Sequence, residues 1–126
     1  MKDEASAIRN GEYAKQLIDF KGLRFGTIMP TDIDAFIDFG GSKFVFIEVK
    51  HQNAPLPLGQ QLALERLADA CDDAGRKTLV LVASHDTEGD IDIANLPVTK
   101  VRFRKQWRDR QGTVREVIDA FLAWAE

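Results

Sequence analysis

Polar and apolar residues alternate along residues 31–39, and after a short break residues 43–50 form a run rich in β-branched and aromatic residues that ends on Glu48 and Lys50. Alternation with a period of two is typical of a strand that is buried on one face. It separates two sets of side chains, with Asp32, Asp34, Phe36 and Asp38 on one face and Ile33, Ala35, Ile37 and Phe39 on the other. Gly40, Gly41 and Ser42 favour a turn, so we expect a β-hairpin.

This hairpin brings acidic residues together at one end. Its second strand finishes with Glu48-Val49-Lys50, and the period of two puts Glu48 and Lys50 on the same face. Neighbouring strands lie about 4.8 Å apart, so Asp34 should stand beside Glu48. Two carboxylates at this spacing repel each other unless a positive charge lies between them.

The downstream pattern predicts a crossover that returns to the same sheet. Residues 51–59 should form a loop, because Pro55 and Pro57 cannot occupy a central strand. A helix over residues 59–74, ended by Gly75, leads to an apolar strand over residues 77–84 that should be buried on both faces. A helix between two strands implies a parallel pair with a right-handed connection.

We therefore expect an α/β fold, with a mixed central sheet (the acidic hairpin plus the parallel strand) flanked by helices. Further strands are predicted at residues 23–26 and 98–107, and a last helix should follow a cap at Thr113.

The helix over residues 59–74 begins with two glutamines that should point in different directions. Gln60 lies on the apolar stripe of Leu64, Leu67, Cys71 and Ala74, whereas Gln61 lies in a row with Glu65, Ala68 and Asp72 that should face water. A glutamine that faces the core needs hydrogen-bond partners. Gln60 could cap backbone carbonyls or point at the acidic cluster, and we favour the cluster.

The composition fits one globular domain spanning residues 1–126. The chain of 126 residues is 44% hydrophobic, which is enough for a single core. No apolar run is long enough to cross a membrane, and the polar start is unlike a signal peptide. A lone Cys71 favours a reducing compartment, so we expect a cytoplasmic protein.

Charge is distributed unevenly along the chain. The net charge is −3, yet residues 100–115 contain seven basic residues against one acidic residue. Alternation predicts that Lys100, Arg102 and Arg104 share one strand face, opposite Val101 and Phe103. Such a face could contact the phosphates of a nucleic acid, or it could be an edge strand protected by charge.

The segment Asp34…Glu48-Val49-Lys50 resembles the active-site signature of the PD-(D/E)XK nuclease superfamily, in particular its resolvase-like members. The resemblance covers about the first two thirds of the chain and implies a restriction-endonuclease-like core. Thr31 separates Pro30 from Asp32, so the signature aspartate could be Asp32 or Asp34. We favour Asp34, because it leads the apolar strand.

The resemblance implies an Mg²⁺-dependent (or Mn²⁺-dependent) nuclease that hydrolyses phosphodiester bonds, with DNA as the expected substrate. Asp34, Glu48 and the backbone carbonyl of Val49 would bind the metal, whose charge polarises a phosphoryl oxygen and makes a bound water more acidic. Lys50 would orient that water or stabilise the developing negative charge.

Three further residues receive roles from the same resemblance. Asp32 could hold a second metal or a metal-bound water, and Gln60 would position water or Lys50. Glu12 matches a first-helix glutamate that reaches the metal in several families with this signature, but a solvated glutamate that favours a first helical turn is the simpler explanation.

Other functions compete with the nuclease. Glu48 and Lys50 could be an exposed ion pair worth about 0–1 kcal/mol, with the aspartates on a solvated edge. An inactive nuclease-like domain could serve as a nucleic-acid-binding or protein-binding module, and a small assembly protein could use the acidic surface. DNA versus RNA and endonuclease versus exonuclease action stay open, and two-strand cleavage would require a homodimer.

Overall fold

The computed structural model describes residues 18–126, and the chain divides into two compact units, Met1–Pro30 and Thr31–Glu126. The described part of the first unit contains a short 3₁₀ helix, Lys21–Leu23, and a reverse turn in which Phe25 and Ile28 exchange two backbone hydrogen bonds. The predicted strand over residues 23–26 is therefore wrong. Glu12 lies outside the described residues, and the single domain over residues 1–126 stays a prediction.

The second unit is an α/β structure built on a mixed sheet, as predicted. Within the described residues the sheet has five strands in the order β1-β2-β3-β4-β5. They are β1 (Ala35–Phe39), β2 (Lys43–His51), β3 (Lys77–His85), β4 (Val98–Phe103) and β5 (Gln106–Asp109). Strands β2 and β3 are parallel, and the other pairs are antiparallel. The acidic hairpin is therefore joined by a parallel strand, as expected.

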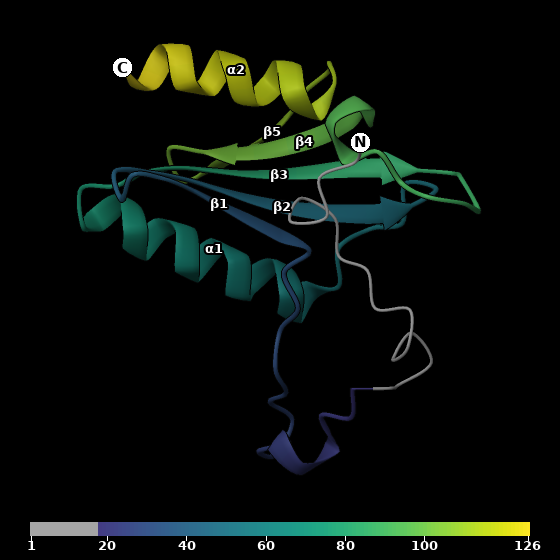
Figure 1. Cartoon of the computed structure of the whole chain (residues 1–126). Coiled ribbons are helices and arrows are strands. Elements are labelled where there is room, and N and C mark those ends of the chain that lie inside the picture. Colours follow the sequence, from purple (N-terminus) through teal and green to yellow (C-terminus); the bar gives the residue numbers. More distant parts are fainter. Residues whose placement is uncertain (1–17) are drawn as a thin grey trace. The chain divides into compact units, whose positions relative to one another are not determined.

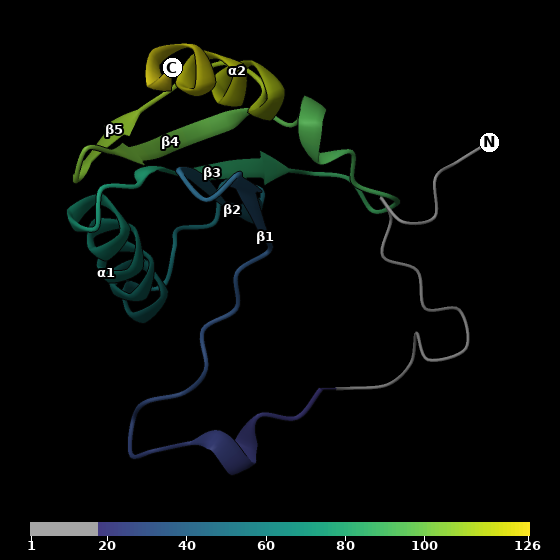
Figure 2. The ribbon, with the colours of Figure 1, turned by 60° about the vertical axis from the view of Figure 1, so that its left-hand side comes forward.

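Two helices cover opposite faces of this sheet (Figures 1 and 2). Helix α1 (Leu58–Asp73) connects β2 to β3, and helix α2 (Val114–Ala125) ends the chain, after a short 3₁₀ helix, η3 (Ile93–Asn95). Strand β3 contributes to both cores: Val80 and Val82 pack towards α1, whereas Leu79 and Leu81 pack towards α2. Its unbroken apolar sequence is explained by this burial on both faces.

The hairpin turn depends on two glycines with positive φ. Gly40 and Gly41 have φ of 71° and 84°, values that residues with a Cβ rarely adopt, and Asp38 Oδ1 accepts the N–H of Gly41 at 2.6 Å. Strand β1 alternates as predicted, with Phe36 and Asp38 exposed. It starts at Ala35, however, four residues later than the alternation suggested.

Helix α1 ends as the sequence predicted but buries a different stripe. Gly75 has a φ of 86°, and the N–H of the next residue reaches back to the carbonyl of Cys71 at 2.9 Å, which completes a glycine C-cap. Leu64 and Ala68 are buried, whereas Leu67 is 40% exposed. Gln61, predicted to face water, is half-buried. The buried stripe of α1 is therefore rotated towards Gln61 and Ala68, which were predicted to lie on the water-facing side.

The predicted strand over residues 98–107 is split into two. Arg104 and Lys105 have φ of 53° and 67° and turn the chain, so that β5 pairs back on β4. Strand β5 also extends to Asp109, two residues beyond the end of the predicted strand. Thr113 caps α2 as expected, because its hydroxyl accepts the N–H of Glu116 while the Glu116 carboxylate accepts the N–H of Thr113. No helix among residues 18–126 is long and apolar enough to cross a membrane.

Candidate active site

Strand β2 carries two charged residues on the sheet face that α1 covers. Phe44 and Phe46 pack in the apolar cluster of α1, and the period of two continues this face to Glu48 and then Lys50. The strand therefore changes from aromatic to charged residues on one face, beside the start of α1.

Asp34 completes the end of the hairpin ladder. The register of β1 and β2 begins with Ala35 opposite Ile47, so Asp34 is the residue just before the ladder. Its Oδ2 accepts a hydrogen bond from the backbone N–H of Val49 at 2.7 Å. This N–H lies beyond the paired residues of β1 and β2, so β1 offers it no backbone partner. This contact holds the carboxyl group of Asp34 beside Glu48, as the strand register predicted.

Gln60, in the first turn of α1, links the charged residues. Its Nε2 donates to Glu48 Oε1 at 2.7 Å and to the main-chain carbonyl of Asp32 at 3.2 Å, while its Oε1 accepts from Lys50 Nζ at 2.9 Å. Lys50 Nζ lies 3.8 Å from Glu48 Oε1. The prediction that Gln60 points at the acidic cluster is therefore confirmed.

Glu48 is buried without full compensation of its charge. The residue is only 3% exposed, and among the described residues its Oε2 has no hydrogen-bond partner. Burial, and then the negative charge of Asp34, raise the pKa of Glu48 from 4.5 to about 7, although Gln60 and Lys50 act in the opposite direction. An exposed ion pair with Lys50 is therefore the wrong description of this carboxylate.

The donor atoms at this point are hard oxygens. The Val49 carbonyl leaves the strand on the same side as its N–H, which points to Asp34, so a carbonyl and two carboxylates face one region. Mg²⁺ prefers such ligands and commonly uses one or two carboxylates while keeping several waters. The unpartnered Oε2 of Glu48 is an oxygen that a cation could satisfy. The residues present therefore fit a hard divalent ion.

A third carboxylate does not join this pair in the described part of the chain. No group of three His, Cys, Asp or Glu side chains suited to a metal occurs among residues 18–126. Asp32 contributes its main-chain carbonyl, which accepts from Gln60, and its predicted role in holding a second metal stays a prediction. The same holds for Glu12, which lies outside the described residues.

The basic residues predicted to share one face do not all do so. Arg104 lies in the turn after β4, with its guanidinium carbon 5.9 Å from the ring centre of Trp124 in α2. Lys100 and Arg102 instead lie over Trp107, at 4.6 and 5.9 Å from its ring centre. Lys100 and Arg102 therefore share a face as predicted, whereas Arg104 does not join them, because the chain turns at Arg104. Nucleic-acid binding by each of them stays a prediction.

An acidic stripe on α1, which the sequence interpretation missed, contacts the β4–β5 hairpin and pairs with two of its basic residues. Its members are spaced four residues apart and each contacts β4, β5 or their turn: Glu65 with Trp107, Asp69 with Arg102, and Asp73 with Lys105. Arg102 donates from Nε at 3.0 Å and from Nη2 at 2.8 Å to the two oxygens of Asp69. The spacing of three acids along one helix face was the available signal.

Comparison of the chain with protein-family models, with curated proteins and with solved structures finds no match in any of the three.

Proposed function

We propose that this protein is a metal-dependent nuclease that hydrolyses phosphodiester bonds in nucleic acid, with DNA as the expected substrate and an active site of the PD-(D/E)XK type. The observation that carries the proposal is Glu48: a buried carboxylate with one unpartnered oxygen, pressed against Asp34 and next to Lys50. Burying one carboxylate beside another is unfavourable, and a bound cation would offset this cost. The arrangement therefore indicates a ligand-binding site. The mixed α/β sheet supports a restriction-endonuclease-like core.

Asp34, Glu48 and the backbone carbonyl of Val49 would hold Mg²⁺ or Mn²⁺. When bound, the metal would polarise a phosphoryl oxygen and make the attacking water more acidic. The protein groups would be held in place before substrate arrives, because Asp34 is fixed by the Val49 N–H and Glu48 by Gln60.

Lys50 supplies positive charge at the developing negative charge of the phosphoryl group. Its ammonium has three donors, and in the structure one of them is directed at Gln60 Oε1. The amide therefore holds the ammonium group of Lys50 near Glu48. Lys50 would stabilise the transition state or orient the attacking water through its other donors.

The test is cleavage of linear, circular and branched DNA, and of RNA, with Mg²⁺ or Mn²⁺ and with a chelator. We expect metal-dependent cleavage that Glu48→Ala abolishes and that Lys50→Ala lowers by on the order of 10²-fold. Lys43→Ala is the matched control, because Lys43 begins the same strand.

Two outcomes would reject the proposal. Binding that persists in chelator and weakens steeply with salt, without cleavage of any substrate, would indicate a nucleic-acid-binding module. No affinity for nucleic acid at moderate salt would indicate a protein-interaction role.

A further inference from the structure

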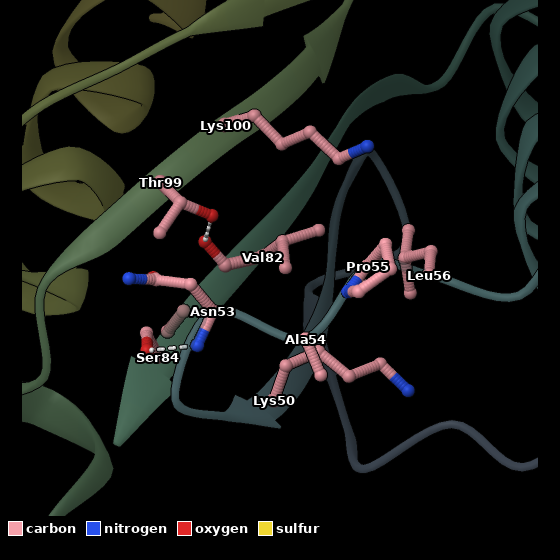
Figure 3. Close-up of a pocket in the computed structure, with 10 residues that line it drawn as sticks. Lys50, Asn53, Ala54, Pro55, Leu56, Val82, Ser84, Thr99 and Lys100 are labelled. Carbon is pink, nitrogen blue, oxygen red and sulfur yellow. Dashed lines mark hydrogen bonds between the residues drawn. The ribbon is translucent and has the colours of Figure 1, made fainter. Parts of the chain in front are cut away.

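A hollow of about 380 Å³ lies next to the candidate active site, on the α1 face of the sheet. It is bordered by the end of β2, by the loop that follows β2, and by β3 and β4 (Figure 3). Lys50 belongs both to the hollow and to the carboxylate cluster. A ligand in the hollow would therefore lie beside Lys50 and the candidate active site.

The loop wall of the hollow is held in a fixed conformation. Gln52 and Asn53 have φ of 51° and 60° and turn the chain sharply after β2. The N–H of Gln52 donates to the carbonyl of His85 at 2.8 Å, and that of Asn53 donates to Ser84 Oγ at 3.0 Å. Pro55 then restricts the backbone of the outgoing loop. The wall is therefore a built feature of the fold.

A β-bulge directs Lys100 into the hollow. The register of β3 and β4 shifts between Val82 and Ala83, which leaves Thr99 as the extra residue, and its hydroxyl donates to the carbonyl of Val82 at 3.2 Å. Strict alternation would place Val98 and Lys100 on one face. Because of the bulge, Val98 is buried towards α2 while Lys100 lines the hollow on the opposite face.

Lys100 keeps its charge available for a ligand. None of the ion pairs within residues 18–126 includes Lys100, whereas Arg102 is paired with Asp69. Its ammonium lies over the ring of Trp107 at 4.6 Å, which orients the side chain without neutralising it. In Figure 3, Lys100 and Lys50 border the hollow from opposite sides.

The remaining lining is partly apolar, with polar side chains among it. Pro55, Leu56 and Val82 contribute hydrocarbon surface, so the hollow combines apolar walls with ammonium groups at its border. Its volume is at the lower end of the range for small-ligand sites and matches one nucleotide rather than a paired duplex. A base can enter such a pocket only when it is unstacked and unpaired.

We infer that this hollow receives one unpaired nucleotide next to the phosphodiester that is cut at Glu48 and Lys50, with Lys100 holding that nucleotide's phosphate. The inference rests on the proposed function and narrows its substrate class. Preferred substrates contain an unpaired nucleotide at the cleavage point, as in single strands, flaps or branches. Continuous duplex is a poor substrate, because opening it costs pairing and stacking energy.

The experiment compares a single strand, a continuous duplex and the same duplex with one extra unpaired nucleotide, for cleavage in Mg²⁺ and for binding in Ca²⁺. Lys100→Met removes the charge and keeps the side-chain stem, with Lys43→Met as its control. Ala54→Trp fills the hollow from an exposed loop position, and Ala70→Trp on the exposed surface of α1 is its control.

We expect the single strand and the duplex with the unpaired nucleotide to bind or react about ten-fold better than continuous duplex. Lys100→Met should weaken single-strand binding by on the order of ten-fold and lower the salt slope by about 0.7, the value for one phosphate contact. Ala54→Trp should remove the preference for unpaired substrates. The two control variants should behave as wild type.

The outcomes separate this inference from the nuclease itself. Cleavage that ignores pairing, or test variants that match their controls, would overturn the hollow as a nucleotide site and leave the nuclease intact. If the wild type cuts no substrate, the nuclease proposal fails, and the binding measurements in Ca²⁺ then test the nucleotide site alone. A single-strand preference that Ala54→Trp removes would still support the site, whereas equal binding of all three probes, or none, would reject it.

Discussion

Replacing Glu48 with glutamine should stabilise the protein at neutral and alkaline pH. Glutamine keeps the shape of the side chain and is neutral at every pH, whereas the glutamate is charged above its pKa. Glu48 is 3% exposed and lies against Asp34, and its pKa is raised to about 7. The folded protein therefore favours the protonated carboxyl group, which the amide replaces without a negative charge.

The magnitude follows from the two pKa values. Unfolded Glu48 has a pKa of 4.5 and folded Glu48 one of about 7, and each pH unit between them is worth about 1.4 kcal/mol, which gives about 3 kcal/mol in total. Between these values the folded state binds more protons than the unfolded state. The contribution of Glu48 to stability is therefore fully present below pH 4.5 and lost as the pH rises through 7.

Urea denaturation of wild type and Glu48→Gln, with a chelator present, measures this effect. The stability gained by the variant should grow by about 3 kcal/mol between pH 4.5 and a pH above 7, because other titrating groups cancel in the difference. Glu88→Gln removes the same charge from an exposed loop and is the control. A stability difference that does not change with pH would refute the account of Glu48 as a buried, uncompensated carboxylate.

Four further results are expected. Mg²⁺ should stabilise wild type above pH 7 by about 2.7 kcal/mol at one hundred times its Kd, and Glu48→Gln should not respond; equal shifts in thermal denaturation would contradict metal binding there. Gln60→Leu removes a donor to Glu48 and should cost about 1–3 kcal/mol in urea unfolding, unlike the exposed Gln111→Leu. Thr113→Ala should cost about 1 kcal/mol, whereas Thr113→Ser should not. Arg102→Met should cost about 1–2 kcal/mol, and an unchanged unfolding midpoint would show that its pair with Asp69 contributes nothing.

The hairpin and the crossover were predictable because their signals are local. Gly40 and Gly41 provide the positive φ that the turn needs, and Gly75 does the same at the end of α1. Strand β3 contains an unbroken apolar run over residues 79–83, which favours a central parallel strand. These features depend on a few neighbouring residues and can be interpreted without knowing the rest of the fold.

The turn between β4 and β5 was missed because it has no such signal. Arg104 and Lys105 adopt positive φ although glycine and asparagine are the residues typical of this conformation. They are held there by tertiary contacts: Arg104 lies against Trp124, and Lys105 pairs with Asp73 of α1. A conformation imposed by distant partners cannot be derived from local propensity.

The carboxylate cluster was predictable to a greater degree than the hollow beside it. The strand register places Asp34 next to Glu48, and helical spacing directs Gln60 towards them, so period and pairing are enough. The hollow depends on the bulge at Thr99, which requires a third strand to be in place. The sequence has no glycine at this point of β4 that could have indicated a bulge.

The groups around Glu48 compensate its two oxygens unequally, and this asymmetry explains why the site suits a cation. Gln60 and Lys50 both act on Oε1, at 2.7 and 3.8 Å, while Oε2 has no partner among the described residues. A second internal lysine at Oε2 would stabilise the fold and remove the need for a ligand. Without one, negative charge is concentrated between Glu48 and Asp34, so a divalent ion gains most by binding there when Glu48 is ionised. Proton and metal therefore compete for the same oxygen, and metal affinity should rise as the pH passes 7.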